Sequence, residues 1–181
     1  MGERSRIRSM IYVALVAALT CIGGFLRVPL FPVPFTLQTL FVYLGGSLLG
    51  SKRGAISQIL FLFIGLSGVP VFAMGGGPGY ILQPTFGYLA GFPVGAFVLG
   101  TWLERAEMSN GILKLYLAHL LALIVVFSIG VAYLYFNVNY ILGKEMNIVY
   151  AVSSGFFVFI PGELVKIIIS VGITSKYKTL F

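Results

Sequence analysis

The stretch TLQTLFVYLGGSLLGSKRGAISQILFLFIGLSGV, residues 36–69, decides how this chain is organised. It is apolar on both sides of Ser51-Lys52-Arg53. If it formed one membrane span, Lys52 and Arg53 would lie in hydrocarbon, where a charged side chain costs about 2.5–3.5 kcal/mol by insertion scales. Two shorter helices, residues 36–50 and 54–69, place both cations in a loop. The sequence therefore predicts a turn at the basic triplet.

The composition of the whole chain points to the lipid bilayer as its solvent. Of the 181 residues, 59% are hydrophobic and 9% are charged, whereas a soluble domain carries about 25% charged residues. A soluble fold of this size cannot cover so much apolar surface. The net charge of +7 resides mainly in short loops between apolar runs, so it does not indicate a nucleic-acid partner.

Apolar runs of span length define the rest of the fold. A membrane-spanning helix needs about 20 apolar residues, and nothing beyond such runs is long enough for a soluble domain. We expect an all-α polytopic membrane protein with a single domain over residues 1–181. The six predicted transmembrane helices cover residues 7–26, 36–50, 54–69, 85–103, 112–136 and 148–175.

The distribution of basic residues sets the orientation. With six spans and both termini in the cytoplasm, the outer loops hold only Arg27 and Lys144. This bias is the one that the positive-inside rule requires. Nine basic residues then lie on the cytoplasmic side: Arg4, Arg6, Arg8, Lys52, Arg53, Arg105, Lys114, Lys176 and Lys178.

Two irregular loops are expected on the outer face in this orientation. The proline loop, residues 27–34, contains three prolines, which lack the N–H that a helix needs. The glycine loop, residues 70–84, contains Gly75-Gly76-Gly77-Pro78-Gly79. In the helix that follows, Gly87, Gly91 and Gly95 are spaced by four, which predicts close packing against another helix.

The last predicted helix contains the segment most informative about function, Phe159-Ile160-Pro161-Gly162-Glu163-Leu164-Val165-Lys166. Glu163 and Lys166 are three apart and share a helix face, midway along an apolar run. One interpretation is an ion pair that only stabilises the fold. The other is a polar pocket wall, because a buried pair contributes little to stability alone, and because Pro161-Gly162 would loosen the helix and free backbone groups beside it.

Other side chains complete a candidate pocket for a small amphiphile. Gln38 offers an amide, and Phe35, Tyr80 and Tyr88 offer aromatic surface near the outer face. Lys166 could hold a carboxylate and Glu163 could accept N–H donors. The chain offers no nucleophile with a base beside it, no metal-ligand cluster and no phosphate loop, so we expect no enzyme activity, no cofactor and no metal.

Several segments, in order along nearly the whole chain, resemble the BioY family, the biotin-specific S components of energy-coupling factor transporters. The segments that carry the resemblance are Val33-Pro34-Phe35-Thr36-Leu37-Gln38-Thr39-Leu40, residues 45–54, Gly68-Val69-Pro70-Val71-Phe72-Ala73, the glycine loop, Pro84-Thr85-Phe86-Gly87-Tyr88-Leu89-Ala90-Gly91-Phe92, and the Glu163–Lys166 motif. The acid of that motif is usually aspartate, so Glu163 is one methylene longer.

The resemblance implies a subunit of a prokaryotic cytoplasmic membrane that binds biotin from outside. Glu163 would contact the bicyclic head, and Lys166 would join the polar network or meet the carboxylate. The loops, with Gly76 and Gly77, would close over the ligand. Ala14 and Ala18 in the first helix would dock a transmembrane coupling protein, which a pair of ATP-binding-cassette ATPases energises.

Two alternatives remain open at this stage. The chain could be an S component for another vitamin, such as thiamine or riboflavin, or it could be an autonomous small-molecule carrier or channel. An intramembrane enzyme would need a nucleophile or a metal dyad, and the sequence offers neither.

Overall fold

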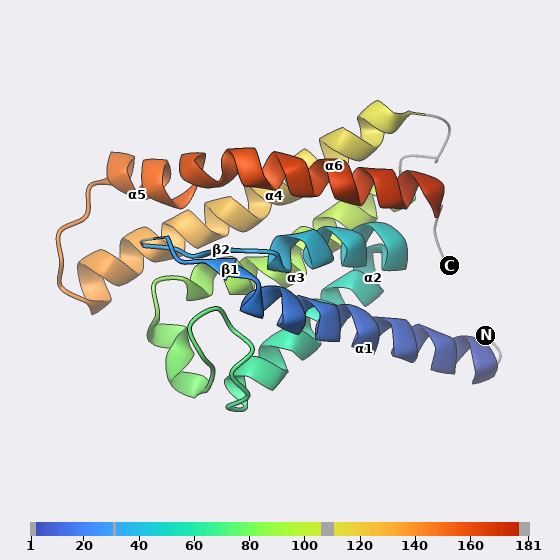
Figure 1. The fold of residues 1–181 in the computed structure, drawn as a ribbon, viewed down its shortest axis with the longest axis horizontal. Coiled ribbons are helices and arrows are strands. Elements are labelled where there is room, and N and C mark those ends of the chain that lie inside the picture. The colour runs from blue at the N-terminus through green and yellow to red at the C-terminus, as the bar shows by residue number, and fades with distance from the viewer. Residues whose placement is uncertain (1–2, 31, 106–110, 178–181) are drawn as a thin grey trace.

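The chain folds as a bundle of helices that run roughly along one axis (Figure 1). This computed structural model describes residues 3–30, 32–105 and 111–177. The prediction of a mostly helical protein is confirmed, with two short strands added. The elements are α1 (Glu3–Phe25), β1 (Arg27–Val28), β2 (Phe35–Thr36), α2 (Gln38–Leu66), the 3-10 helix η1 (Pro78–Leu82), α3 (Phe86–Arg105), α4 (Ile112–Phe136), the π-helix η2 (Asn137–Ile141), α5 (Ile148–Gly155), the 3-10 helix η3 (Phe157–Phe159) and α6 (Ile160–Lys176).

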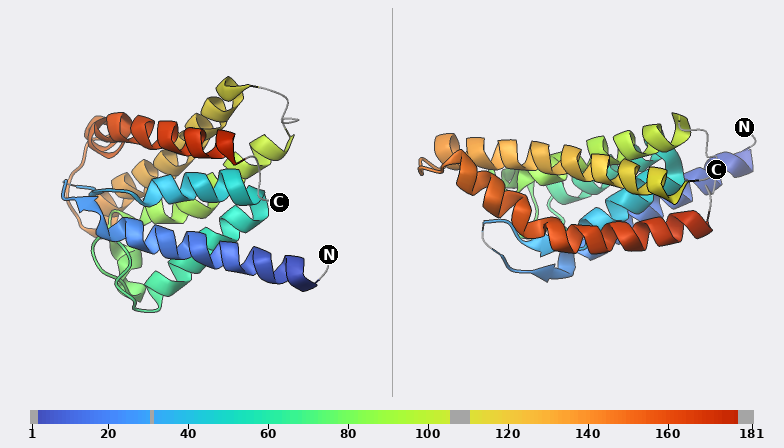
Figure 2. Two further views of the ribbon diagram at one scale, coloured as in Figure 1. Left: turned by 45° about the vertical axis from the view of Figure 1, so that its right-hand side comes forward. Right: turned by 90° about the horizontal axis from the view of Figure 1, so that it is seen from above.

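The two predicted loops lie at the same end of the bundle. The ends of the proline loop pair as antiparallel strands, with Arg27 opposite Thr36 and Val28 opposite Phe35. The glycine loop is less irregular than expected, since it contains η1. Both loops face the end opposite to the start of α1 and the end of α6 (Figures 1 and 2).

Helix α2 is broken into two arms beside the basic triplet, where the charge pattern predicts a turn. Gly50 has φ 79° and ψ −179°, a backbone conformation open almost only to glycine. The second arm then runs back toward the end where α2 begins (Figure 1). The carboxylate of Glu104 caps this arm, accepting the Ser51 backbone N–H at 2.7 Å and the Ser51 hydroxyl at 2.8 Å. These bonds attach the start of the second arm to the end of α3.

Small residues bring α3 close to its neighbours, as the glycine spacing predicts. A Cβ atom on Gly91 would lie 3.0 Å from the Val126 carbonyl oxygen of α4, and one on Gly95 would lie 2.4 Å from a Val126 methyl. On the other side, a Cβ atom on Gly46 of α2 would lie 2.6 Å from the Ala96 carbonyl oxygen. Any larger side chain at these positions would push the helices apart.

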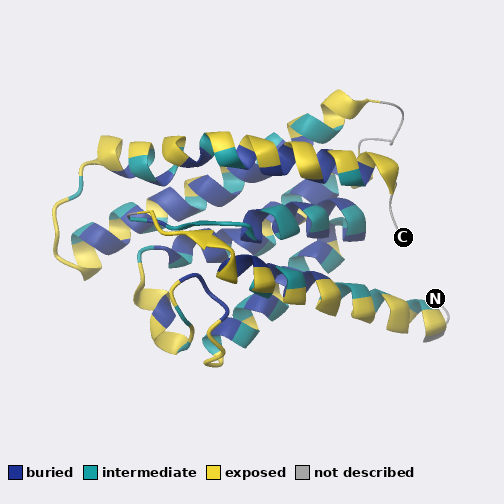
Figure 3. Ribbon diagram, in the orientation of Figure 1, coloured by how far each residue is buried: buried dark blue, intermediate teal, exposed yellow. Residues whose placement is uncertain are grey.

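Among the residues that the structure describes, four helical segments are long and apolar enough to cross a membrane: Arg4–Phe25, Phe86–Arg105, Ile112–Ile141 and Ile148–Lys176. Apolar side chains cover much of the outside of the bundle, including Phe63 at 70% and Val149 at 71% exposure. Buried residues face the interior, and exposed ones line the outer faces of α1, α5 and α6 (Figure 3). This surface fits a bilayer, while the count of six spans stays a prediction.

The break in the last span lies earlier than Pro161-Gly162, where the sequence places it. The helix is interrupted at Phe156, with φ −129° and ψ −63°, and η3 follows. Pro161 lies in the first turn of α6, where a missing N–H leaves no hydrogen bond unmade. The proline therefore starts the helix that carries Glu163 and Lys166.

Candidate ligand-binding site

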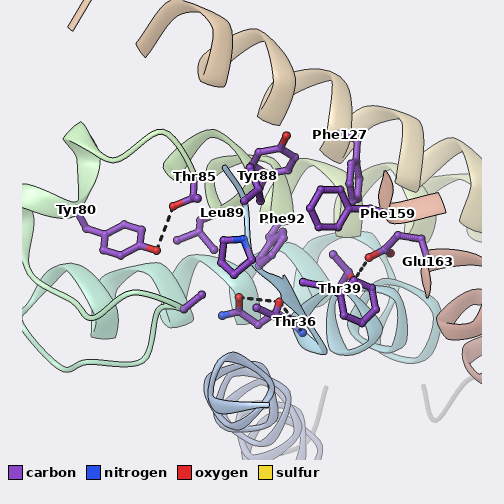
Figure 4. A pocket seen from close by; sticks show the side chains of 15 residues that line it. Thr36, Thr39, Tyr80, Thr85, Tyr88, Leu89, Phe92, Phe127, Phe159 and Glu163 are labelled. Atoms are coloured by element: carbon purple, nitrogen blue, oxygen red, sulfur yellow. Dashed lines mark hydrogen bonds between the residues drawn. The ribbon is translucent and has the colours of Figure 1, made fainter. Parts of the chain in front are cut away.

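A cavity of about 50 Å³ lies below the two loops, between the starts of α2, α3 and α6 (Figure 4). Its walls come from segments far apart in the sequence, and they consist mainly of aromatic and other apolar side chains with a few polar groups. Such a lining is typical of small-ligand sites. The lining residues are Val33, Pro34, Phe35, Thr36, Gln38, Thr39, Ala73, Tyr80, Thr85, Tyr88, Leu89, Phe92, Phe127, Phe159 and Glu163.

Glu163 is the acidic group of this cavity. It is 2% exposed and lies in the first turn of α6, where the positive end of the helix dipole favours a carboxylate. Its Oε1 accepts the Thr39 hydroxyl at 2.9 Å, and its Oε2 accepts the Tyr43 hydroxyl at 2.8 Å. Both donors lie on the first arm of α2, so these bonds tie α6 to α2.

Lys166 completes the network beside the cavity. Its Nζ donates to Glu163 Oε1 at 2.5 Å, to the Thr36 carbonyl oxygen at 2.6 Å and to Thr39 Oγ1 at 2.8 Å. The ammonium also lies 4.0 Å from the centre of the Phe35 ring. An ammonium has three protons, and all three are used. Of the two roles expected for Lys166, this geometry matches membership of the polar network.

Both interpretations of the Glu163–Lys166 pair find support in this arrangement. The two side chains are in direct contact, as a structural ion pair requires. Glu163 nevertheless lines the cavity, as a ligand contact requires. A carboxylate accepts about four hydrogen bonds, and three donors are seen, two on Oε1 and one on Oε2. One acceptor position on Oε2 is left for a donor in the cavity.

Gln38 adds a donor to the same cavity. The side chain is 2% exposed, and its Oε1 accepts the Thr36 hydroxyl at 3.2 Å. Its Nε2 has no hydrogen-bond partner among the residues that the structure describes. A buried amide left unpaired costs about 1–3 kcal/mol, so this N–H group is available to a polar partner.

Tyr80 and Tyr88 form part of the aromatic wall, as the sequence predicts. The Tyr80 hydroxyl lies 3.2 Å from Thr85 Oγ1, and the Tyr88 hydroxyl donates to the Gly155 carbonyl oxygen at 2.8 Å. Burial raises the pKa of Tyr80, and the hydrogen bonds to Thr85 and Met74 and the charge of Arg27 partly oppose this. The tyrosine hydroxyl therefore stays protonated at neutral pH and can donate.

Gly76 and Gly77 do not line the cavity, although they were expected among the ligand contacts. The Gly77 N–H donates to the Gly65 carbonyl oxygen at 2.7 Å, and a Cβ on Gly76 would lie 2.2 Å from the Val69 carbonyl oxygen. These glycines hold the loop against the end of α2. Their position fixes η1, which in turn places Tyr80 in the cavity wall.

Sequence reasoning missed the residues that hold Glu163 in place. Thr39 and Tyr43 are four apart, and Ser47 follows at the same spacing, so one face of the first arm carries a polar stripe. That stripe was the available signal. Phe127 and Phe159 also line the cavity, but nothing in the pattern separates them from the chain's other phenylalanines.

Comparison with known proteins gives one consistent result. The BioY family matches residues 1–181. A protein of Lysinibacillus sphaericus named "Probable biotin transporter BioY" is 39% identical over 181 residues, covering 100% of this chain and 92% of the relative. The biotin transporter BioY of Thermotoga maritima is 36% identical over 176 residues, covering 96% and 98%. A crystal structure of the S-component for biotin from an ECF-type ABC transporter superposes with TM-score 0.86 at 30% identity, covering 97% and 93%.

The network around Glu163 makes a prediction about stability. The substitution Lys166→Met leaves a buried carboxylate without its cation and should destabilise the protein by about 3–5 kcal/mol. The double variant Glu163→Gln/Lys166→Met removes both charges and should recover most of the loss. Thermal unfolding in detergent measures both. If the single and the double variant lose the same amount of stability, Lys166 does not stabilise the protein by neutralising the charge of Glu163.

Proposed function

Because this chain belongs to the BioY family, we propose that it captures biotin at the outer face of the membrane as the substrate-binding subunit of an energy-coupling factor transporter. The relatives are named biotin transporters, and the superposed structure is an S-component for biotin. The protein is a transporter subunit and not an enzyme. The observation that carries the proposal is a buried carboxylate, Glu163, that faces the cavity with an acceptor position to spare.

The polar groups of the cavity match the head of biotin. Its ureido ring offers two N–H donors and one carbonyl oxygen. Glu163 Oε2 would accept an N–H, and Gln38 Nε2 would donate to the carbonyl oxygen. The aromatic walls, including Tyr88 and Phe127, would cover the apolar bicycle. One N–H, the carbonyl oxygen and the apolar rings of the ligand each then meet a suitable partner in the cavity.

Binding requires the site to open and close. A water molecule needs about 10–15 Å³ of such space, so the 50 Å³ cavity holds only a few waters. The proline loop, which carries Val33 and Pro34 on the cavity wall, would move outward to admit biotin. It would close again over the bound ligand and exclude water.

Six spans with both termini in the cytoplasm complete the proposal. In this proposal the two arms of α2, on either side of the break at Gly50, are the second and third spans, and α5, η3 and α6 together are the sixth. The 29 residues of α2 leave each arm shorter than the roughly 20 residues of a full span. The close contacts of Gly46 and Gly54 then pack these short arms inside the bundle.

Release to the cytoplasm would depend on partners, a membrane coupling protein and a pair of ATPases. Ala14 and Ala18 are exposed on α1, one turn apart, while Ala17 is buried at 1%. Exposed small residues let another helix approach closely in lipid. This face of α1 is the docking surface that we propose for the coupling protein.

The ligand assignment is tested by labelled biotin binding to the purified chain. Glu163→Gln keeps the shape but replaces the charged acceptor, and a hydrogen bond to a charged group is worth about 1.5–3 kcal/mol. Binding should weaken about 10- to 100-fold. Ser170→Ala on the same helix, whose hydroxyl bonds His119 at 2.9 Å, is the control and should bind normally. Unchanged binding by Glu163→Gln would remove Glu163 from the site, and absent binding by the wild type would reject biotin as the ligand.

The docking surface is tested by a bulky substitution. Ala14→Trp should leave biotin binding intact and abolish ATP-dependent uptake in vesicles that contain the partner subunits, because the indole blocks close helix approach. Ile124→Trp, at a position 51% exposed on α4, is the matched control and should support uptake. Normal uptake by Ala14→Trp would place the coupling protein on another face.

A further inference from the structure

A second and much larger hollow lies at the same end of the bundle as the cavity. It has a volume of about 990 Å³, at the upper end of the roughly 300–1,000 Å³ typical of small-molecule sites. We call it the vestibule. Three segments form it: the proline loop, the end of the glycine loop with η1, and the connection from η2 to α5. Most of its lining is apolar, including Pro29, Pro32, Met74, Leu82 and Leu142.

The vestibule adjoins the cavity that Glu163 lines. Pro34 and Thr85 line both spaces, so only these residues and their neighbours separate them. The hydroxyl of Thr85 lies 3.2 Å from that of Tyr80 (Figure 4). A ligand that rests in the vestibule is therefore next to the inner cavity.

Three charged side chains also line the vestibule. Arg27, Lys144 and Glu145 line it, and all three are exposed. Within the described part of the chain, none of them forms an ion pair, since the salt bridge seen there joins Lys166 and Glu163. The vestibule therefore has an apolar lining and, with two cations and one anion at its rim, a net positive charge.

We infer that the vestibule is the first landing place of the ligand, and that Arg27 and Lys144 draw in its carboxylate. The inference rests on the proposed function, since biotin carries an apolar ring system and an anionic tail. The prolines and Met74 would receive the rings while the two cations hold the carboxylate at the rim. The inner cavity is too small for biotin until the loops move. A ligand held in the vestibule is therefore more often present when the loops open.

A rim of exposed charges changes the association rate of a ligand more than its affinity. Exposed charged side chains contribute little to binding energy. When charges of one sign line a cleft with low-dielectric walls, however, their electric field is concentrated in the cleft, and a ligand of opposite charge arrives faster. In water, two unit charges about 7 Å apart interact with an energy of roughly RT. Removing one of them should therefore change the association rate about threefold. Glu145 opposes the two cations on the same rim, and its removal should speed arrival.

The experiment is stopped-flow association with the purified chain in an uncharged detergent, with biotin and the neutral biotin amide as probes. At low ionic strength, Arg27→Gln and Lys144→Gln should each slow biotin about threefold, the double variant about tenfold, and Glu145→Gln should speed it. Dissociation rates and the arrival of the amide should not change. Lys176→Gln, in the last turn of α6 at the opposite end, is the matched control and should behave as wild type.

Salt and the neutral probe decide the outcome. At about 1 M salt the Debye length falls to roughly 3 Å, so the differences between variants should vanish. If the variants associate with biotin as fast as the wild type, or slow the amide equally, the steering role of the rim is overturned while biotin binding stands. If the wild type binds no biotin, the proposed function fails and this inference fails with it.

Discussion

The bond network of Glu163 is the constraint on which the rest of this structure depends. A carboxylate and an ammonium are buried together in an apolar bundle, where either alone would be strongly unfavourable. Thr39, Tyr43 and the Thr36 carbonyl supply the remaining partners. Because these groups belong to the start of α2 and to β2, the network fixes α6 against the segment that follows the proline loop. The same bonds orient the carboxylate toward the cavity.

Backbone features elsewhere serve to bring these partners into reach. The turn at Gly50 sends the second arm of α2 back along the bundle, and Glu104 caps it. Glycines on α2 and α3 allow contacts at backbone distance, so the first arm reaches deep enough for Tyr43 to meet Glu163. Gly162 contributes directly, because a Cβ there would lie 2.3 Å from the Phe35 ring. Close packing and ligand chemistry are therefore coupled in this fold.

The sequence predicts local features well and long-range partners poorly. The turn near Ser51 follows from the cost of charge in hydrocarbon, and the shared face of Glu163 and Lys166 follows from their spacing of three. The contact of Thr39 with Glu163 joins residues 124 apart in the chain, and no periodicity encodes it. The missing N–H of Pro161 predicts a loosened helix beside Glu163, but the first turn of a helix tolerates that lack. Gly76 and Gly77 support the loop, a role that composition cannot separate from ligand contact.

We propose that Glu163 is buried beside the cavity because its carboxylate receives an N–H of the ligand. The most direct measurement is an experimental structure of the protein with biotin bound. Our account predicts a ureido nitrogen about 2.7–3.2 Å from a Glu163 carboxylate oxygen, with the ring system between the aromatic walls. Biotin bound elsewhere, with Glu163 and Lys166 enclosed and out of its reach, would contradict it.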